Sequence, residues 1–139
     1  MPKVFLDTNV LVYQLDKRYL TKQRTSRDLA REAAGRGEAV ISTQVLQEFY
    51  VVATTKLKVD VVLAKAIMNR LCNMEVVTVT IELISQAIDI HIQNNISFWD
   101  ALIVAAAASA NCEKVLTEDM NDGQTISGVK ISNPYVKTK

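Results

Sequence analysis

The sequence contains 139 residues, of which 49% are hydrophobic and 22% are charged, and its formal net charge is +1. This length is typical of one domain, so we expect a single domain over residues 1–139 with a core that needs no disulfide bonds. The near-neutral charge excludes a uniformly basic protein, and any surface that binds nucleic acid must therefore be local.

Cysteine content and apolar run lengths bear on the cellular location. Cys72 and Cys112 are too few for a disulfide framework. Residues 1–3 lead directly into an apolar run, which leaves no room for the hydrophobic segment of a signal peptide. The longest apolar stretch, residues 101–108, is far shorter than the ~20 residues of a membrane-spanning helix. We therefore expect a cytoplasmic protein with two reduced thiols and no contact with a membrane.

The chain opens with an apolar run, Val4-Phe5-Leu6, that ends at Asp7. An unbroken apolar run of this kind predicts a strand that is buried on both faces, as in a parallel sheet. Open α/β sheets bind ligands beyond the carboxyl ends of their strands, which is where Asp7 is expected. A short helix is predicted from Thr8 to Leu15, with Asp7 or Thr8 as its N-cap.

Residues 16–36 form a polar segment in which basic side chains outnumber acidic ones. The basic residues are Lys17, Arg18, Lys22, Arg24, Arg27, Arg31 and Arg36. Two interpretations carry equal weight. The segment is either a solvated helix face or an electrostatic contact for phosphates beside an acidic cleft.

A second strand is predicted at Ala39-Val40-Ile41-Ser42, followed by a helix from Thr43 to about Lys56. At ~100° per residue, Glu48 lies about 40° from Val52 and about 60° from Val45 on the helical wheel, so it flanks the apolar face. An acid in that position is costly unless it is paired or bound to a metal. The alternative is that the Glu48 side chain simply extends into water.

Two more helices are predicted in the middle of the chain. Asp60 is expected to cap the first, whose helical spacing places Met68 and Cys72 in the core. The second runs from Thr80 to about Asn94 and carries His91 on its apolar face, where a half-buried structural role is expected. Because His91 is the only histidine, ribonuclease chemistry with a histidine pair and a serine–histidine–aspartate triad are both disfavoured.

A further helix is predicted over residues 98–110, with Ser97 as its N-cap. Ser97-Phe98-Trp99-Asp100 fits the [ST]-x-x-[DE] pattern of a capping box, which by itself would explain Asp100. The beginning of a helix in an α/β fold also faces the crevice at the strand ends. Asp100 is therefore a candidate metal ligand as well as a cap.

Three other short strands are expected, at residues 76–79, at residues 115–117 and, at the edge of the sheet, at residues 129–131. The strand at residues 115–117 is followed by Asp119, which repeats the pattern of an apolar run that closes on an acid. Asn121-Asp122-Gly123 is predicted to form a turn.

Short strands that alternate with helices predict an α/β protein, a three-layer α/β/α sandwich with a mainly parallel central sheet. In such a fold one rim of the sheet would hold four acids that have no lysine or arginine next to them in sequence: Asp7, Glu48, Asp100 and Asp119. These carboxylates would repel one another unless a hard cation were bound. Ligation by oxygen alone is typical of Mg²⁺ or Mn²⁺ and not of zinc.

Four segments of this sequence together resemble the successive motifs of PIN-domain ribonucleases, in particular the VapC-type toxins of type II toxin–antitoxin systems. The segments are Phe5-Leu6-Asp7-Thr8-Asn9, Ser42-Thr43-Gln44-Val45-Leu46-Gln47-Glu48-Phe49, Trp99-Asp100-Ala101 and Leu116-Thr117-Glu118-Asp119-Met120. The resemblance runs nearly the whole chain in the right order. It implies a PIN-like fold in which the four acids bind one or two Mg²⁺ or Mn²⁺ ions.

The same resemblance assigns further roles. It implies that Asn9 and Thr43 or Ser42 support the site through hydrogen bonds, and that Asp122 either binds a second ion or only shapes its turn. The implied activity is endoribonuclease cleavage of RNA by water, which leaves a 5′ phosphate and a 3′ hydroxyl. The basic segment, with Lys56 and Lys58, would position the RNA backbone. The implied partners are a second copy of the chain and a small antitoxin whose C-terminal arm blocks the site.

Three alternatives remain at this stage. A haloacid-dehalogenase-like phosphotransferase also begins with an aspartate after an apolar strand, but it requires a second aspartate at the position of Asn9. A receiver domain requires a phosphoacceptor on a middle strand and a nearby lysine, neither of which is evident. A non-catalytic PIN-like module would bind RNA or protein only, and it would gain nothing from mutually repelling acids.

Overall fold

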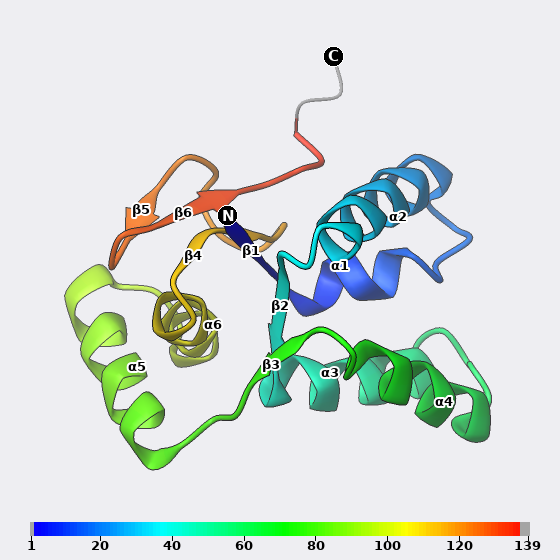
Figure 1. Ribbon diagram of the computed structural model, residues 1–139, viewed down its shortest axis with the longest axis horizontal. Helices are drawn as coiled ribbons and strands as arrows, with labels where there is room; N and C mark the ends of the chain where they lie inside the picture. The colour runs from blue at the N-terminus through cyan, green and yellow to red at the C-terminus, as the bar shows by residue number, and fades with distance from the viewer. Residues whose placement is uncertain (1, 137–139) are drawn as a thin grey trace.

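The computed structural model describes residues 2–136 and consists of a central sheet with helices on both sides (Figure 1). Six strands form the sheet in the order β3-β2-β1-β4-β6-β5. The strands are β1 (Lys3–Leu6), β2 (Ala39–Ser42), β3 (Glu75–Val77), β4 (Cys112–Leu116), β5 (Thr125–Ile126) and β6 (Val129–Ser132). All strand pairs are parallel except β5 with β6. The prediction of a mainly parallel α/β/α sandwich is confirmed.

Six helices flank the sheet, and the sequence located the beginning of most of them. They are α1 (Thr8–Tyr13), α2 (Leu20–Gly35), α3 (Thr43–Thr55), α4 (Val61–Leu71), α5 (Ile81–Asn94) and α6 (Phe98–Ser109). In Figure 1, α5 and α6 lie on one side of the sheet and α1 and α2 on the other, with α3 and α4 near β3. No helix within residues 2–136 is long and apolar enough to cross a membrane.

The centre of the sheet determines where the candidate acids lie. β1 and β4 are parallel neighbours in which Phe5 is in register with Val115 and Leu6 with Leu116. All four side chains are buried, which accounts for the unbroken apolar runs in the sequence. Because the two strands end together, the residues that follow them, Asp7 and Thr117, emerge side by side at the same rim.

Small side chains let α6 pack closely against the sheet. Every residue from Ala101 to Ala107 is buried, although a helix on the surface of a domain normally exposes one face. The helix is covered by the sheet on one side and by α5 on the other (Figure 1). The beginning of α6, with Asp100 in its first turn, is thereby held at a fixed position relative to β1 and β4.

The last strand is not the edge of the sheet, which corrects the sequence prediction. β6 lies between β4 and the two-residue strand β5, which forms the edge. The β5–β6 hairpin turns through Ser127 and Gly128, both at positive φ (51° and 81°), as a type I′ turn requires. A two-residue strand is too short to show alternation, so only the Ser-Gly dipeptide signalled the hairpin.

Two predictions about burial were wrong. Cys72 is exposed and follows the last residue of α4, and Met68 is only partly buried, because α4 packs on α3 and leaves much of its apolar face open. Helical spacing identifies an apolar face but not whether anything covers it. His91 is exposed instead of half-buried, and its Nδ1 atom forms a hydrogen bond with the carbonyl oxygen of Ile96.

Candidate active site

Asp7 is the most buried acid at the rim, with only 4% of its surface exposed. It is the N-cap of α1, and its Oδ1 accepts a hydrogen bond from the Thr8 backbone N–H at 2.7 Å. Its Oδ2 accepts one from the Thr117 hydroxyl at 2.7 Å. Burial raises the pKa of Asp7 from 3.8 to about 6, while the bonds from Thr117 and Thr8 lower it and the nearby Asp119 and Glu48 raise it further. Asp7 is therefore a carboxylate that the fold holds in place at an electrostatic cost.

Glu48 points toward the same rim from the second turn of α3. The Thr8 hydroxyl donates to its Oε1 at 2.6 Å, and the Gln44 amide donates to its Oε2 at 3.1 Å. The Gln44 amide also donates to the carbonyl oxygen of Trp99 at 3.3 Å, which links α3 to the beginning of α6. Glu48 flanks the apolar face of α3, as the helical wheel predicts. In this position two neighbouring side chains orient its carboxylate.

Asp119 lies beyond the end of β4 and is held by hydrogen bonds to neighbouring polar groups. Its Oδ2 accepts from the Asn9 amide at 3.0 Å, and its backbone N–H donates to the Thr117 hydroxyl oxygen at 3.0 Å. Because the Thr117 hydroxyl also donates to Asp7, one completely buried threonine connects both acids. The two strand ends are thus joined by a continuous set of hydrogen bonds.

Asp100 lies in the first turn of α6, directly after its N-cap turn begins at Ser97, and faces the electrostatic field of the other acids. The Ser97 hydroxyl oxygen accepts a hydrogen bond from the Asp100 backbone N–H at 3.0 Å, so Ser97 caps α6. Burial raises the pKa of the Asp100 carboxyl, as do the negative charges of Asp119 and Glu48, and a hydrogen bond with Ser97 lowers it. Asp100 therefore lies within electrostatic reach of the other acids as well as at a helix N-terminus.

Among residues 2–136, no lysine or arginine forms an ion pair with these four acids. The ion pairs within that range involve Glu75, Asp16, Glu118, Asp28 and Glu32. Glu118, next to Asp119, is by contrast paired with Lys22 at 2.5 Å. The rim is therefore a concentration of negative charge that the described residues do not compensate by ion pairs.

The donor set suits a hard divalent cation, because carboxylates supply the oxygen ligands that Mg²⁺ and Mn²⁺ prefer. In the described part of the chain, however, no three acidic, histidine or cysteine groups already surround one position closely enough to hold an ion. Binding an ion here would therefore require the carboxylates to move closer together. The carboxylates of the rim are chemically suited to such an ion, but they do not form a closed ligand shell.

The sequence resemblance implies that Asn9, Ser42 and Thr43 support the site, and the structure gives these residues different contacts. Asn9 contacts Asp119 directly. The Ser42 hydroxyl oxygen caps α3 by accepting from the Val45 backbone N–H, and the Thr43 hydroxyl oxygen accepts from the Val79 backbone N–H. Ser42 and Thr43 thus fix the helix that carries Glu48, and within residues 2–136 neither hydroxyl forms a hydrogen bond with any of the four acids.

Asp122 does not join the other acids in this structure. It lies in the loop after β4, and its Oδ1 accepts a hydrogen bond from the Asn133 backbone N–H at 2.8 Å. This contact agrees with the alternative in which Asp122 only shapes its turn.

Sequence reasoning did not identify three polar residues that orient the acids: Thr8, Gln44 and Thr117. Thr8 and Thr117 each stand within two residues of a predicted acid, which was an available signal. Gln44 lies four residues before Glu48, one helical turn away, and its buried Oε1 has no hydrogen-bond partner among the described residues.

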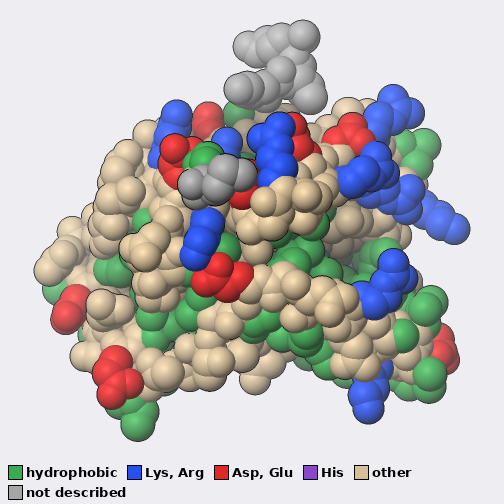
Figure 2. Space-filling model, in the orientation of Figure 1, with side chains coloured by type: hydrophobic (Ala, Val, Ile, Leu, Met, Phe, Trp, Pro, Cys, Tyr) green, Lys and Arg blue, Asp and Glu red, His purple; other side chains and the backbone are tan. Residues whose placement is uncertain are grey.

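A cavity of about 550 Å³ begins at this rim and extends toward α2. Its lining includes Thr8, Asn9, Glu48 and Asp119 at one end. Figure 2 shows lysine and arginine side chains gathered over the part of the surface where Figure 1 places α1 and α2. The acids therefore open into a space large enough for a ligand group, with positive charge nearby.

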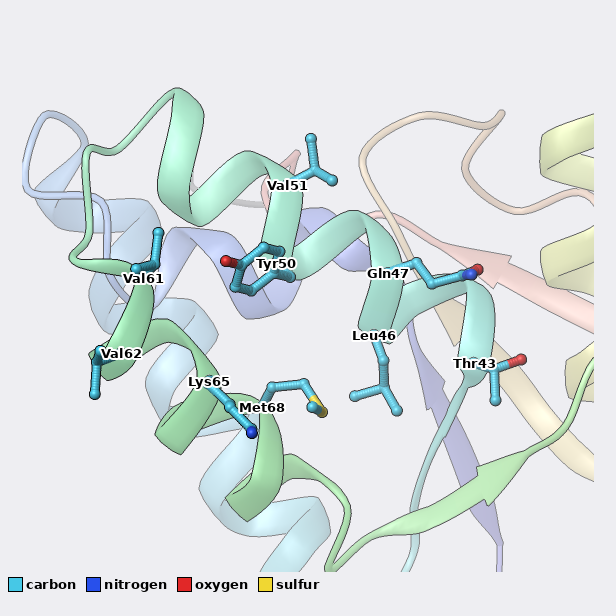
Figure 3. A pocket seen from close by; sticks show the side chains of 9 residues that line it. All are labelled: Thr43, Leu46, Gln47, Tyr50, Val51, Val61, Val62, Lys65 and Met68. Atoms are coloured by element: carbon cyan, nitrogen blue, oxygen red, sulfur yellow. The ribbon is translucent and has the colours of Figure 1, made fainter.

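A second, larger cavity of about 1000 Å³ lies between α3 and α4 (Figure 3). We call it the α3–α4 groove; it is lined by Thr43, Leu46, Gln47, Tyr50, Val51, Val61, Val62, Lys65 and Met68. Helical spacing puts Glu48, Val52 and Lys56 on the opposite side of α3, facing the first cavity. The helix α3 is thus a wall between an acidic cavity and an apolar groove.

Mutation can separate the cap of α6 from the predicted role of Asp100 as a metal ligand. We expect Ser97→Ala to remove the cap of α6 and to lower the free energy of unfolding by about 1 kcal/mol, while leaving unchanged the RNA cleavage that the sequence resemblance implies. Asp100→Asn should keep most of the stability, because Ser97 and not Asp100 is the N-cap, yet it should abolish that cleavage. Urea unfolding and a cleavage assay on both variants test this. If Asp100→Asn cleaves normally, Asp100 is not a metal ligand.

Comparison with solved structures first defines the class of fold. A chain of a Klebsiella pneumoniae toxin–antitoxin complex is 20% identical, with 96% of this chain and 98% of that chain covered and a TM-score of 0.71. A chain of a DNA-bound VapBC complex from Salmonella typhimurium is 19% identical, with 96% and 99% covered and a TM-score of 0.70. The Mycobacterium tuberculosis toxin VapC20, described as cleaving the sarcin–ricin loop, is 24% identical, with 84% and 92% covered and a TM-score of 0.63. The fold is the one found in these VapC-type structures.

The sequence then gives the family. The family model described as the PIN domain matches residues 4–121, so this chain belongs to the PIN domain family. Comparison with curated protein sequences finds no match. The matched region contains all four rim acids, and it ends just before Asp122.

Proposed function

We propose that this protein is a divalent-metal-dependent endoribonuclease and the toxin of a toxin–antitoxin pair. The observation that carries the proposal is the rim itself, where Asp7, Glu48, Asp100 and Asp119 come from four separate segments and no lysine or arginine of residues 2–136 forms an ion pair with any of them. Family membership and the VapC-type fold support the same function.

Each side chain has a definable part in that activity. Asp7 supplies a carboxylate whose orientation is fixed by Thr8 and Thr117, and the Thr8 hydroxyl and Gln44 amide fix Glu48. Asp100 and Asp119 would complete the ligand set. A Mg²⁺ or Mn²⁺ ion bound there supplies activation of water for attack on a phosphodiester and stabilisation of charge on the leaving oxygen. The remaining contribution of the protein is to position the RNA strand over the rim.

A cleavage assay tests the proposal directly. We expect single-stranded RNA to be cut with Mg²⁺ or Mn²⁺ and to remain intact with EDTA, with products that carry a 5′ phosphate and a 3′ hydroxyl. Glu48→Gln keeps the shape and much of the hydrogen bonding of the side chain but removes its charge, so it should lower the rate at least ~100-fold. Intact RNA in the presence of wild-type protein and Mn²⁺ would instead favour a non-catalytic module.

We infer an antitoxin partner from the same fold, since the similar structures include toxin–antitoxin and VapBC complexes. The α3–α4 groove offers it an apolar surface, with Val51, Val61 and Val62 all more than half exposed. An amphipathic helix laid in this groove would bury those side chains. A C-terminal arm that continues from the groove around α3 would reach Glu48, where a basic side chain could pair with the acids.

A homodimer is proposed on the exposed face of α5. Ile81, Ile84, Ile88 and Ile92 recur at helical spacing and are between 39% and 82% exposed. An apolar stripe of this kind on a helix is typical of an interface. In Figure 1, α5 lies at the left of the molecule and α4 at the right, so pairing through α5 would leave the α3–α4 groove open.

A further inference from the structure

The structure separates the basic residues of the α1–α2 region into those already used inside the protein and those still available. Lys22 donates to Glu118 at 2.5 Å and to the Tyr13 hydroxyl at 3.2 Å. Arg36 pairs with Glu32, Arg31 lies 3.7 Å from Asp28, and the Arg27 Nε–H donates to the carbonyl oxygen of Gln14. Lys22, Arg31 and Arg36 are therefore already paired with carboxylates of the protein.

Two cationic side chains, Arg18 and Lys56, line the same cavity as the acids of the rim. The lining of the 550 Å³ cavity continues from Glu48 and Asp119 to Arg18, Tyr19 and Lys56. Lys56 follows the last residue of α3, eight residues after Glu48, which is ~12 Å along a helix axis. This separation is larger than one phosphate group, so a strand whose reacting phosphate lies at the acids would present a neighbouring nucleotide to Lys56.

Arg18 is held in a fixed orientation while keeping donors available. Its Nε and Nη2 atoms donate to the two carboxylate oxygens of Asp16 at 2.9 and 2.8 Å, and Asp16 itself is only 3% exposed. A guanidinium carries five N–H groups, so the N–H groups of Nη1 remain for another anionic oxygen. The pair with Asp16 also lowers the pKa of that carboxyl, so it persists at neutral pH.

Tyr19 presents an aromatic surface at the same end of the cavity. The side chain is 47% exposed, the Arg18 guanidinium carbon lies 5.3 Å from the ring centroid, and the ring packs edge-on against Tyr13 with centroids 5.9 Å apart. Tyrosine rings that are fixed in this way serve as stacking surfaces for unpaired nucleobases in proteins that bind single strands.

We propose that Arg18, Tyr19 and Lys56 form a subsite for the nucleotide next to the cleaved bond, with its phosphate on Arg18 and Lys56 and its base on Tyr19. The proposal rests on the proposed ribonuclease function and deepens it, since it places the substrate on one side of the acids and requires single-stranded RNA there. An acidic protein segment would suit the cations but would leave the role of Tyr19 unexplained, so the observations favour RNA.

Binding measurements can test the subsite without relying on cleavage. The experiment uses fluorescence anisotropy of a labelled single-stranded RNA 12-mer with full-length Asp7→Asn protein, titrated over a range of salt concentrations. We expect an added Lys56→Gln change to weaken binding about 5- to 10-fold and to reduce the slope of log Kd against log salt by ~1. Lys130→Gln, on the exposed part of β6, removes the same charge outside the cavity and should change neither quantity. Equal effects of the two changes would overturn the proposal.

Tyr19 and Arg18 are tested in the same assay. Tyr19→Leu should weaken binding about 10-fold with an unchanged salt slope, because it removes stacking but no charge, and Tyr19→Phe should bind as the parent does. Arg18→Lys keeps the pair with Asp16 but loses the fork, and it should weaken binding several-fold. Unchanged RNA binding in the Lys56→Gln and Tyr19→Leu proteins, with lost binding of an acidic peptide, would assign the surface to a protein partner and overturn the subsite.

The binding and cleavage assays together distinguish failure of the subsite from failure of the ribonuclease proposal. If wild-type protein never cuts RNA but binding depends on Lys56 and Tyr19 as described, these residues form a site for single-stranded RNA and the catalytic assignment falls. If RNA is cut and substitution of Lys56 or Tyr19 does not change binding, the catalytic assignment stands and the subsite falls.

Discussion

Asp7→Asn should abolish RNA cleavage and at the same time stabilise the protein in the absence of metal. A pKa raised from 3.8 to about 6 in a side chain that is 4% exposed corresponds to ~3 kcal/mol of unfavourable free energy for the charged form at neutral pH. Asn removes that charge and remains a good N-cap for α1, while losing one acceptor for the Thr117 hydroxyl costs about 1 kcal/mol. The removal of the buried charge outweighs the lost acceptor, so the free energy of unfolding of the Asp7→Asn protein should be higher. Cleavage should fall by at least ~1000-fold, because a neutral amide is a poor ligand for a hard cation.

The measurement pairs urea unfolding in EDTA with a cleavage assay in Mn²⁺, both at pH 7.5. Asp28→Asn is the matched control, since Asp28 lies on the exposed part of α2 and its substitution should alter neither stability nor rate. A variant that loses activity because it unfolds would show the opposite stability change. Full activity in the Asp7→Asn protein would remove Asp7 from the site.

The stability of the metal-free protein should fall as the pH rises from 5 to 7.5. The folded pKa of Asp7 is raised above its unfolded value, so the folded state binds the proton more tightly, and the stability that this proton adds is lost as the pH rises toward and through about 6. With folded and unfolded values of about 6 and 3.8, the loss between pH 5 and 7.5 is ~1.4 kcal/mol. Burial also raises the pKa of Asp100, which acts in the same direction.

Bound metal should reverse this trend. A cation competes with the proton for Asp7, so saturating Mn²⁺ should stabilise the protein more at pH 7.5 than at pH 5. The carboxyl groups with lowered pKa values, Asp16 and Glu118, act mainly below pH 4.5 and do not disturb this window. Urea unfolding at five pH values, with EDTA or Mn²⁺, measures both slopes, and Asp7→Asn should flatten them. A metal-free stability that rises with pH in this range would show that Asp7 is not buried as described.

The parallel sheet and its acidic rim were predictable because strong local signals define them. Apolar runs that stop at Asp7 and shortly before Asp119 mark buried strands, and two such strands that lie side by side must end at one edge. Capping residues located helix starts equally well, since Asp60, Thr80 and Ser97 all accept hydrogen bonds from the first turns of their helices. These features depend on neighbours in sequence.

The features that escaped prediction depend on contacts between distant segments. Thr117 contacts Asp7 across 110 positions in the sequence, and Lys22 pairs with Glu118 across 96. No local pattern indicates that Lys22 forms an ion pair while Lys56 forms none with the residues that the structure describes. The burial assigned to Cys72 was wrong for the same reason, because whether α4 is covered is decided by the rest of the fold.

The two-sided character of α3 constrains how this protein can change over evolutionary time. Gln47 and Val51 contribute to the apolar groove, while Glu48 and Val52, one position further along, line the acidic cavity. A substitution in the groove that changes binding of the proposed partner therefore lies next in sequence to a residue that lines the acidic cavity. Substitutions on this helix that change binding of the proposed partner should therefore be restricted to those that leave its backbone in place. Exchange of the whole helix between relatives should alter the groove and the position of Glu48 together.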